Sequence, residues 1–126
     1  MRVMIFAKST PESELQAQAG PEDGDMAAGY ETMATFHEEL SKAGVLLASE
    51  RLEPSTKGAR VTFDGPKRTV IDGPFTESKE LVAGYWLWQV RSLDEAIEWL
   101  KRAPFPDGVE LELRPILEMD GFEPQA

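Results

Sequence analysis

The sequence contains no cysteine and a single histidine among its 126 residues. Without cysteine the chain forms no disulfide, carries no catalytic thiol and offers no thiolate ligand to a metal. One histidine, together with carboxylates that lack the spacing of a calcium loop, predicts no metal site. The sequence also lacks a glycine-rich phosphate loop, a nucleophile elbow and a dinucleotide-binding fingerprint. We therefore expect neither a metal nor a cofactor.

Long hydrophobic runs are absent too, and basic residues are scarce. No apolar stretch approaches the roughly 20 residues that cross a bilayer, and the N-terminal run is too short for a signal peptide. The 13 Lys and Arg residues face 23 Asp and Glu, giving a formal charge of -10 that repels phosphate backbones. The sequence thus predicts one cytoplasmic domain over residues 1–126, with neither nucleic acid nor membrane as a partner.

What is present is a regular alternation of strands and helices. The expected elements are strands at 2–7, 45–53, 59–64, 67–72, 81–90 and 109–116 and helices at 26–43 and about 93–103. Gly44 suits the end of the first helix, and Ser92 with Glu95 forms a capping box at the second. The polar stretch from Lys8 to Asp25 predicts a long loop, either mobile or acting as a lid.

The strands at 59–64 and 67–72 form a hairpin, and without it the order is βαββαβ, the ferredoxin-like α+β pattern. In that fold two helices cover one face of a four-stranded antiparallel sheet. The other face, which carries Trp86 and Trp88 or their neighbours, is too apolar to face water. Two such sheets packed face to face would cover it, so we expect a homodimer. A monomer with an exposed ligand groove is the alternative.

The tripeptide Asp-Gly-Pro occurs twice, and its two copies have different surroundings. Asp64-Gly65-Pro66 lies between two strand-like runs, and a hairpin turn explains it. The second copy begins at Asp72 and continues through Phe75 into a polar segment. The strand expected at 81–90 follows, and we call it the aromatic strand because it holds a tyrosine and two tryptophans. Phe75 is a large apolar residue in a polar loop, so it either fills the core or lines a cleft.

Two charged or titratable side chains are further candidates for a site. His37 lies beside the apolar face of the first helix, and its near-neutral pKa makes it the natural general acid or base. A structural histidine is the alternative. Arg51 and Glu50 are adjacent on a strand and point to opposite faces. Arg51 is therefore a candidate to bind a ligand carboxylate or phosphate, with an internal ion pair as the alternative.

The segments FHEELSKAGVLLASERLEP and DGPFTESKELVAGYWLWQVRSLDEAIEWLKRAP carry a family resemblance. They resemble the DGPF family within the broader YCII-related superfamily, and the likeness runs from MRVMIFA to ELRPI. The resemblance implies a dimeric α+β barrel, a bacterial context often beside extracytoplasmic-function sigma factors, and a cleft holding a histidine and an aspartate. In that superfamily the helical histidine lies about three turns before the closing glycine, which here points to Met33 rather than His37. Asp72, Gly73, Pro74 and Phe75 match their motif directly.

Three hypotheses follow. In the first, a small-molecule site, catalytic or not, lies between the D-G-P-F loop and the aromatic strand. His37 would then be the acid or base, Asp72 its orienting partner and Arg51 the anchor of an anionic ligand, with Gly73, Pro74, Phe75 and Trp86 in the binding site. The fold implies no reaction class. In the second, the chain is a non-enzymatic regulatory or interaction protein linked to sigma-factor-dependent transcription. In the third, the D-G-P-F loop only fixes a strand entry.

Overall fold

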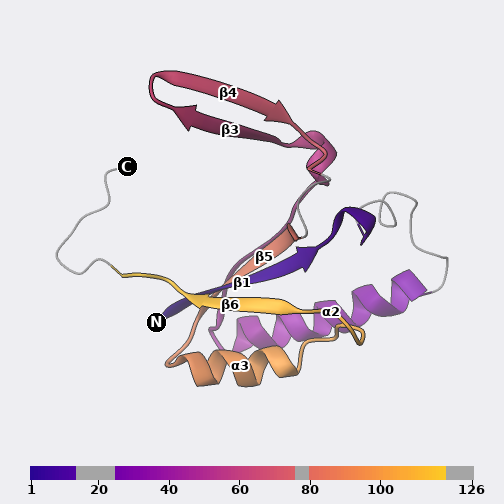
Figure 1. The fold of residues 1–126 in the computed structure, drawn as a ribbon. Helices are drawn as coiled ribbons and strands as arrows, with labels where there is room; N and C mark the ends of the chain where they lie inside the picture. The colour runs from indigo at the N-terminus through magenta and orange to yellow at the C-terminus, as the bar shows by residue number, and fades with distance from the viewer. Residues whose placement is uncertain (14–24, 76–79, 119–126) are drawn as a thin grey trace.

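The computed structural model describes residues 1–13, 25–75 and 80–118 (Figure 1). The elements are β1 Arg2–Ser9, α2 Asp25–Lys42, β2 Leu46–Arg51, the 3-10 helix η1 Ser55–Lys57, β3 Ala59–Asp64, β4 Lys67–Asp72, β5 Leu81–Gln89, α3 Leu93–Lys101 and β6 Leu111–Pro115. Each predicted strand and helix is present, with ends shifted by a few residues. The loop expected at 8–25 lies for the most part outside the described residues, and β1 includes its first two.

Four strands form the main sheet, in the order β2-β5-β1-β6, and each neighbouring pair is antiparallel. This order, with α2 and α3 on one face, confirms the ferredoxin-like α+β fold from which dimeric α+β barrels are built. Strands β3 and β4 form a separate two-stranded sheet. Figure 1 shows this hairpin projecting from the body on the side of the main sheet away from the two helices.

The local signals that end and begin elements act as predicted. Gly44 has a φ of 74° after α2, and Gly65 has a φ of 57° in the hairpin turn, both in the left-handed region that favours glycine. At the start of α3, the Ser92 hydroxyl accepts a hydrogen bond of 3.1 Å from the Glu95 N–H. The Glu95 carboxylate in turn accepts one of 3.3 Å from the N–H of Arg91, one residue earlier than in a standard capping box.

The core lies between the main sheet and the two helices. It includes Val3 and Ile5 of β1, Trp86 and Trp88 of β5, Phe36 and Leu40 of α2, and Ala96 of α3. Both tryptophans are therefore buried beneath the helices, and Trp88 is fully covered. Of the two alternatives for the uncovered face, the tryptophans or their neighbours, the structure selects the neighbours. Because aromatic residues occupy successive positions of β5, the sequence allows either of its faces to form the core. The position of the helices decides which face is buried.

The opposite surface of the sheet, here called the open face, carries Met4, Phe6, Ala48, Tyr85 and Leu87. The register pairs Met4 with Leu87 and Phe6 with Tyr85, which places these side chains on one surface. Ala48 pairs with Leu87 from the other neighbouring strand. All five are half-buried, and in the described chain no helix lies over them (Figure 1).

Candidate functional site

The D-G-P-F loop joins the hairpin to the body of the molecule. The Gly73 N–H donates a 3.0 Å hydrogen bond to the Gly58 carbonyl. A Cβ on Gly73 would overlap the backbone carbonyl of Ser55, so only glycine fits there. The Gly73–Pro74 peptide is cis, and the Phe75 N–H then donates to the Ser55 hydroxyl over 3.3 Å. The second Asp-Gly-Pro therefore fixes the base of the hairpin against η1.

The ring of Phe75 lies at this base rather than in the core. The guanidinium of Arg60, on β3, lies 3.9 Å from the centre of the ring, a cation–π contact. Gly58 lies behind the ring, since a Cβ there would be 3.8 Å from the Phe75 Cε2 atom. Phe75 is half-buried. Of the two roles expected for it, the structure supports the lining of a cleft.

A groove of about 400 Å³ opens beside Phe75, between the end of β2, η1, the hairpin and the start of β5. We call it the hairpin-base groove. It is lined by Leu52, Glu53, Pro54, Ser55, Lys57, Gly58, Arg60, Phe75, Glu80, Leu81 and Val82. Apolar walls therefore meet charged groups of both signs, as expected for a site that orients a small amphipathic ligand.

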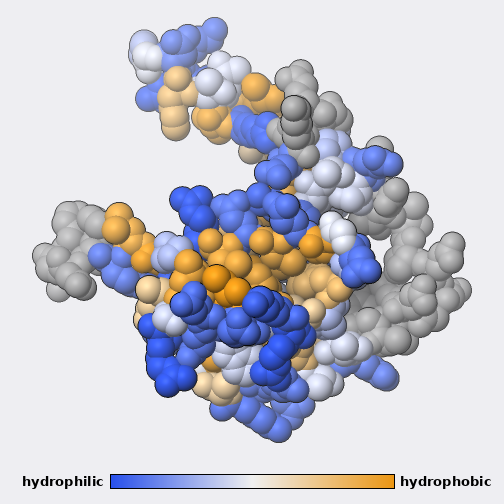
Figure 2. Space-filling view, turned by 60° about the horizontal axis from the view of Figure 1, so that its bottom comes forward, coloured by the Kyte–Doolittle hydropathy of each residue, from blue (hydrophilic) through white to orange (hydrophobic). Residues whose placement is uncertain are grey.

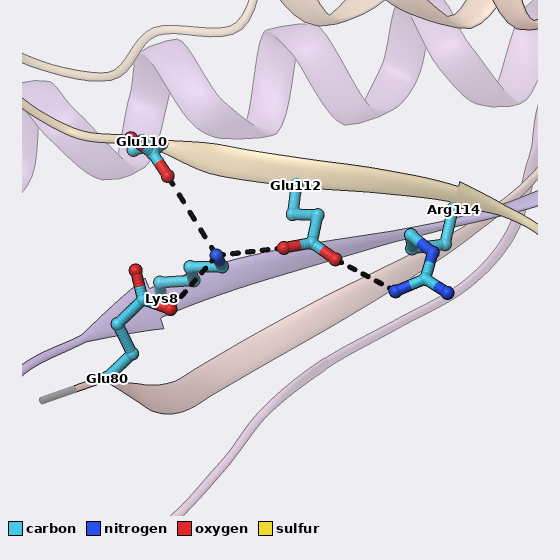
Figure 3. Close-up of polar contacts among 5 residues, drawn as sticks. All are labelled: Lys8, Glu80, Glu110, Glu112 and Arg114. Carbon is cyan, nitrogen blue, oxygen red and sulfur yellow. Dashed lines mark hydrogen bonds and ion pairs between the residues drawn. The ribbon is translucent and has the colours of Figure 1, made fainter. Parts of the chain in front are cut away.

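One acidic residue of the groove belongs to a wider ion-pair cluster (Figure 3). The Lys8 ammonium lies 3.2 Å from the Glu80 carboxylate, 2.8 Å from Glu112 and 3.8 Å from Glu110. Arg114 lies 3.2 Å from Glu112. Hydrogen bonds to Glu112 and Glu80 raise the pKa of Lys8, and those from Lys8 and Arg114 lower the pKa of Glu112. Glu80 thus shares the Lys8 ammonium with Glu110 and Glu112, and the cluster as a whole stays negatively charged.

His37 lies elsewhere, at the boundary of the core beneath the sheet. The Trp86 indole N–H donates a hydrogen bond to His37 Nε2 over 2.9 Å, and the two rings meet edge-on at 77° with centres 5.6 Å apart. Because Nε2 accepts this bond, the neutral ring carries its proton on Nδ1. Burial lowers the pKa of His37, which also favours the neutral form.

The structure does not bring the predicted catalytic pair together in one chain. His37 is on α2, whereas Asp72 is an exposed residue at the end of β4, opposite Ala59 in the hairpin. Among the described residues, the hydrogen bond to the His37 side chain comes from Trp86.

The other five predicted residues lie around the groove or apart from it. Trp86 is in the core, away from the groove lining. Arg51 is exposed at the end of β2, next to Leu52 in the sequence but not in the lining. Gly73 and Pro74 hold Phe75 in place, and of the predicted residues Phe75 alone is in the lining.

Sequence reasoning missed Lys57 and Arg60, the two basic residues of the groove. Lys57 falls between the strands expected at 45–53 and 59–64, and Arg60 is one residue of the second of these strands. Their proximity to Phe75 depends on the contact of η1 with the D-G-P-F loop, which no local pattern encodes. In the three described stretches, no group of three His, Asp or Glu side chains is placed to hold a metal ion. The helices described there are too short or too polar to span a membrane.

Comparisons with known proteins agree with this fold. Residues 1–120 match the family described as YCII-related domain. An uncharacterised protein of Rhizobium meliloti is 35% identical over 69 residues, which make up 55% of this chain and 56% of that protein. The chain thus matches little more than half of that relative's length. Among solved structures, 5-chloro-2-hydroxyhydroquinone dehydrochlorinase from Burkholderia phenoliruptrix, in complex with 2,5-dihydroxybenzoquinone, is similar with a TM-score of 0.50. The identity is 13%, and the alignment covers 98% of this chain and 100% of that one, which shows a shared fold.

Proposed function

This chain belongs to the YCII-related domain family, and on that premise we propose that it binds a small molecule in the hairpin-base groove. The observation that carries the proposal is the placement of Phe75. The D-G-P-F loop holds this ring at the groove, although a strand entry alone needs no aromatic side chain there. The motif at Asp72–Phe75 also supports membership of the narrower DGPF family.

The lining favours a ligand with an apolar or aromatic body and one anionic group. Leu52, Phe75 and Leu81 supply apolar surface, against which a small ring gains hydrophobic and stacking contacts. Lys57 and Arg60 supply positive charge, and of the two carboxylates in the lining, Glu53 and Glu80, the second is paired with Lys8. A carboxylate such as that of benzoate matches this combination.

We infer that His37 has a structural role and not a catalytic one. A general base needs an unoccupied lone pair near the substrate. The Nε2 lone pair of His37 accepts from Trp86, and neither residue lines the groove. The proposal therefore assigns no reaction to a His37–Asp72 pair.

We also propose that the protein is a cytoplasmic homodimer that associates through the open face. Its side chains include Met4, Phe6, Tyr85 and Leu87, an apolar group that a second open face would remove from water. The dimeric α+β barrel is the assembly in which this fold covers that face.

The proposed function is tested by calorimetric titration with three ligands of matched size: benzoate, benzamide and benzylamine. We expect benzoate to bind most tightly, and Phe75→Ala to weaken its binding by about fivefold, since one aromatic contact contributes about 1 kcal/mol. Phe63→Ala is the matched control, because Phe63 contacts Arg68 in the same hairpin, at 4.5 Å, but is not in the groove lining. Tighter binding of benzylamine, or equal effects of the two substitutions, would overturn the assignment.

The formal charge of -10 favours one alternative, a regulatory protein that binds a basic partner linked to sigma-factor-dependent transcription. A salt-sensitive complex with a purified sigma factor, with no binding of the three ligands, would favour this function over the first.

A further inference from the structure

The β3–β4 hairpin has no core of its own in the single chain. Every residue of both strands is exposed, and the two strands pair with each other and not with the main sheet. An isolated two-stranded hairpin is marginally stable in water. The hydrogen bond from Gly73 to Gly58 and the contact of Arg60 with Phe75 close the base of the hairpin, while its surface stays uncovered.

The two faces of the hairpin differ in character. Val61 pairs with Val70 and Phe63 with Arg68, which places three apolar side chains on one face. We call Val61, Phe63 and Val70 the arm face; their exposed fractions are 51%, 72% and 63%. Thr62 pairs with Thr69 on the opposite, more polar face. Figure 2 shows hydrophobic residues among hydrophilic ones along the hairpin, which stands clear of the body.

The charge of the hairpin is opposite to that of the rest of the chain. Residues 59–72 hold three of the 13 Lys and Arg residues and two of the 23 Asp and Glu, a net charge of +1. The remaining sequence has ten basic and 21 acidic residues, a net charge of -11. On the face of the sheet away from α2, three carboxylates surround Lys8, so this side is also acidic (Figure 3). A second copy of the chain is therefore an electrostatically complementary partner for the hairpin.

The position of the hairpin favours the same partner. It projects on the side of the main sheet where the open face lies (Figure 1). A second copy that covers the open face thus approaches the molecule on the side from which the hairpin extends. The acidic surface of that copy would then lie against the basic hairpin and cover the arm face.

We propose that the β3–β4 hairpin is an intersubunit arm, whose arm face packs against the body of a second copy in the homodimer. The proposal rests on the homodimer proposed above. It adds a second contact to the interface between the open faces, and each subunit supplies one arm to the other. The rigid D-G-P-F base then serves two purposes, because it forms the groove and also sets the direction of the arm.

The absence of cysteine allows a direct test by thiol labelling. Four single substitutions are made: Val61→Cys and Val70→Cys on the arm face, and Thr62→Cys and Thr69→Cys as matched controls on the other face. Each variant is labelled with a maleimide reagent at two protein concentrations, one above and one below the dissociation constant of the dimer. Sedimentation velocity on the same samples shows whether the protein is a dimer or a monomer. Each pair is a direct cross-strand pair, so position along the hairpin is matched.

In the dimer, we expect the two arm-face cysteines to react about tenfold or more slowly than the two control cysteines. Dilution to monomer should abolish this difference. Equal labelling rates of all four cysteines in a confirmed dimer would contradict the intersubunit arm, although the proposed homodimer would still stand. Protection that persists in the monomer would show that the arm face packs on its own chain, which also overturns the proposal. A protein that stays monomeric at every concentration would contradict the proposed homodimer, and the arm with it.

Discussion

The Trp86 indole N–H donates a hydrogen bond to Nε2 of His37 over 2.9 Å, which joins β5 to α2. The bond satisfies a buried indole and fixes the histidine tautomer. It also makes the neutral imidazole the form that fits, because a protonated Nε2 would be a second donor facing the first. The pKa of His37 is therefore sensitive to the packing of the core around Trp86.

The first prediction concerns the pKa of His37. As the sole histidine, it gives a single imidazole resonance set in a proton NMR titration. We expect its pKa to lie below the ordinary value of about 6.5, because burial and the Trp86 donor both oppose protonation. Trp86→Phe removes the donor and should move the pKa upward. A wild-type pKa at or above the ordinary value would contradict this environment.

The same shift predicts how stability depends on pH. The unfolded chain binds a proton at His37 more readily than the folded chain, so folding stability should be complete above about pH 6.5 and should fall as the pH falls below it. Urea unfolding between about pH 7 and pH 5.5, above the range in which most carboxylates titrate, measures the effect. His37→Gln should flatten this dependence. An unchanged slope in the variant would assign the effect to other groups.

The second prediction concerns the base of the hairpin. Gly73→Ala should destabilise the contact with η1, because a Cβ there overlaps the Ser55 carbonyl. Gly58→Ala is the control, since a Cβ at Gly58 meets its nearest atom at an ordinary 3.5 Å. Amide hydrogen exchange in β3 and β4 should accelerate by about tenfold or more in Gly73→Ala, and much less in Gly58→Ala. Equal acceleration in both variants would contradict the specific need for glycine at position 73.

The third prediction concerns the open face. Leu87→Lys introduces a charge where two sheets are proposed to meet, twice per dimer. We expect the dimer to weaken by about hundredfold or more, since burying one leucine contributes about 1.5–3 kcal/mol. Ala34→Lys, on an exposed position of α2, is the control and should leave the dissociation constant unchanged. Sedimentation equilibrium gives both constants, and an unaffected Leu87→Lys dimer would place the interface elsewhere.

The fourth prediction concerns Lys8. Lys8→Met leaves the carboxylates of Glu80, Glu110 and Glu112 without their shared cation, so the variant should be less stable than wild type at pH 7. The loss should shrink as the pH falls below about 4.5, because the carboxylates become protonated. The control is Lys42→Met, which removes an exposed helical pair with Glu38 and should have little effect. Urea unfolding midpoints at pH 7 and below about pH 4.5 measure the effect. An equal loss of stability at both values would show that the carboxylates around Lys8 are not its cause.

The sequence predicted best what depends on near neighbours. Gly44, Gly65 and Ser92 act through the residues beside them, so helix ends and the hairpin turn could be located from the chain alone. The face chosen by Trp86 and Trp88 could not, because β5 is apolar on both sides and the covering helices decide. Nor could the groove, because Lys57 and Arg60 meet Phe75 through the packing of η1 against Gly73, a contact between segments far apart in sequence.

We propose that ligand binds in the hairpin-base groove and not around His37. The most direct measurement is a titration of isotopically labelled protein with benzoate, followed by amide chemical shifts in the wild type and in Phe75→Ala. We predict that the shift changes gather at Leu52, Gly58, Leu81 and Val82 and weaken in the variant. Shift changes centred on His37 and Trp86, or changes that Phe75→Ala leaves unaltered, would contradict the account.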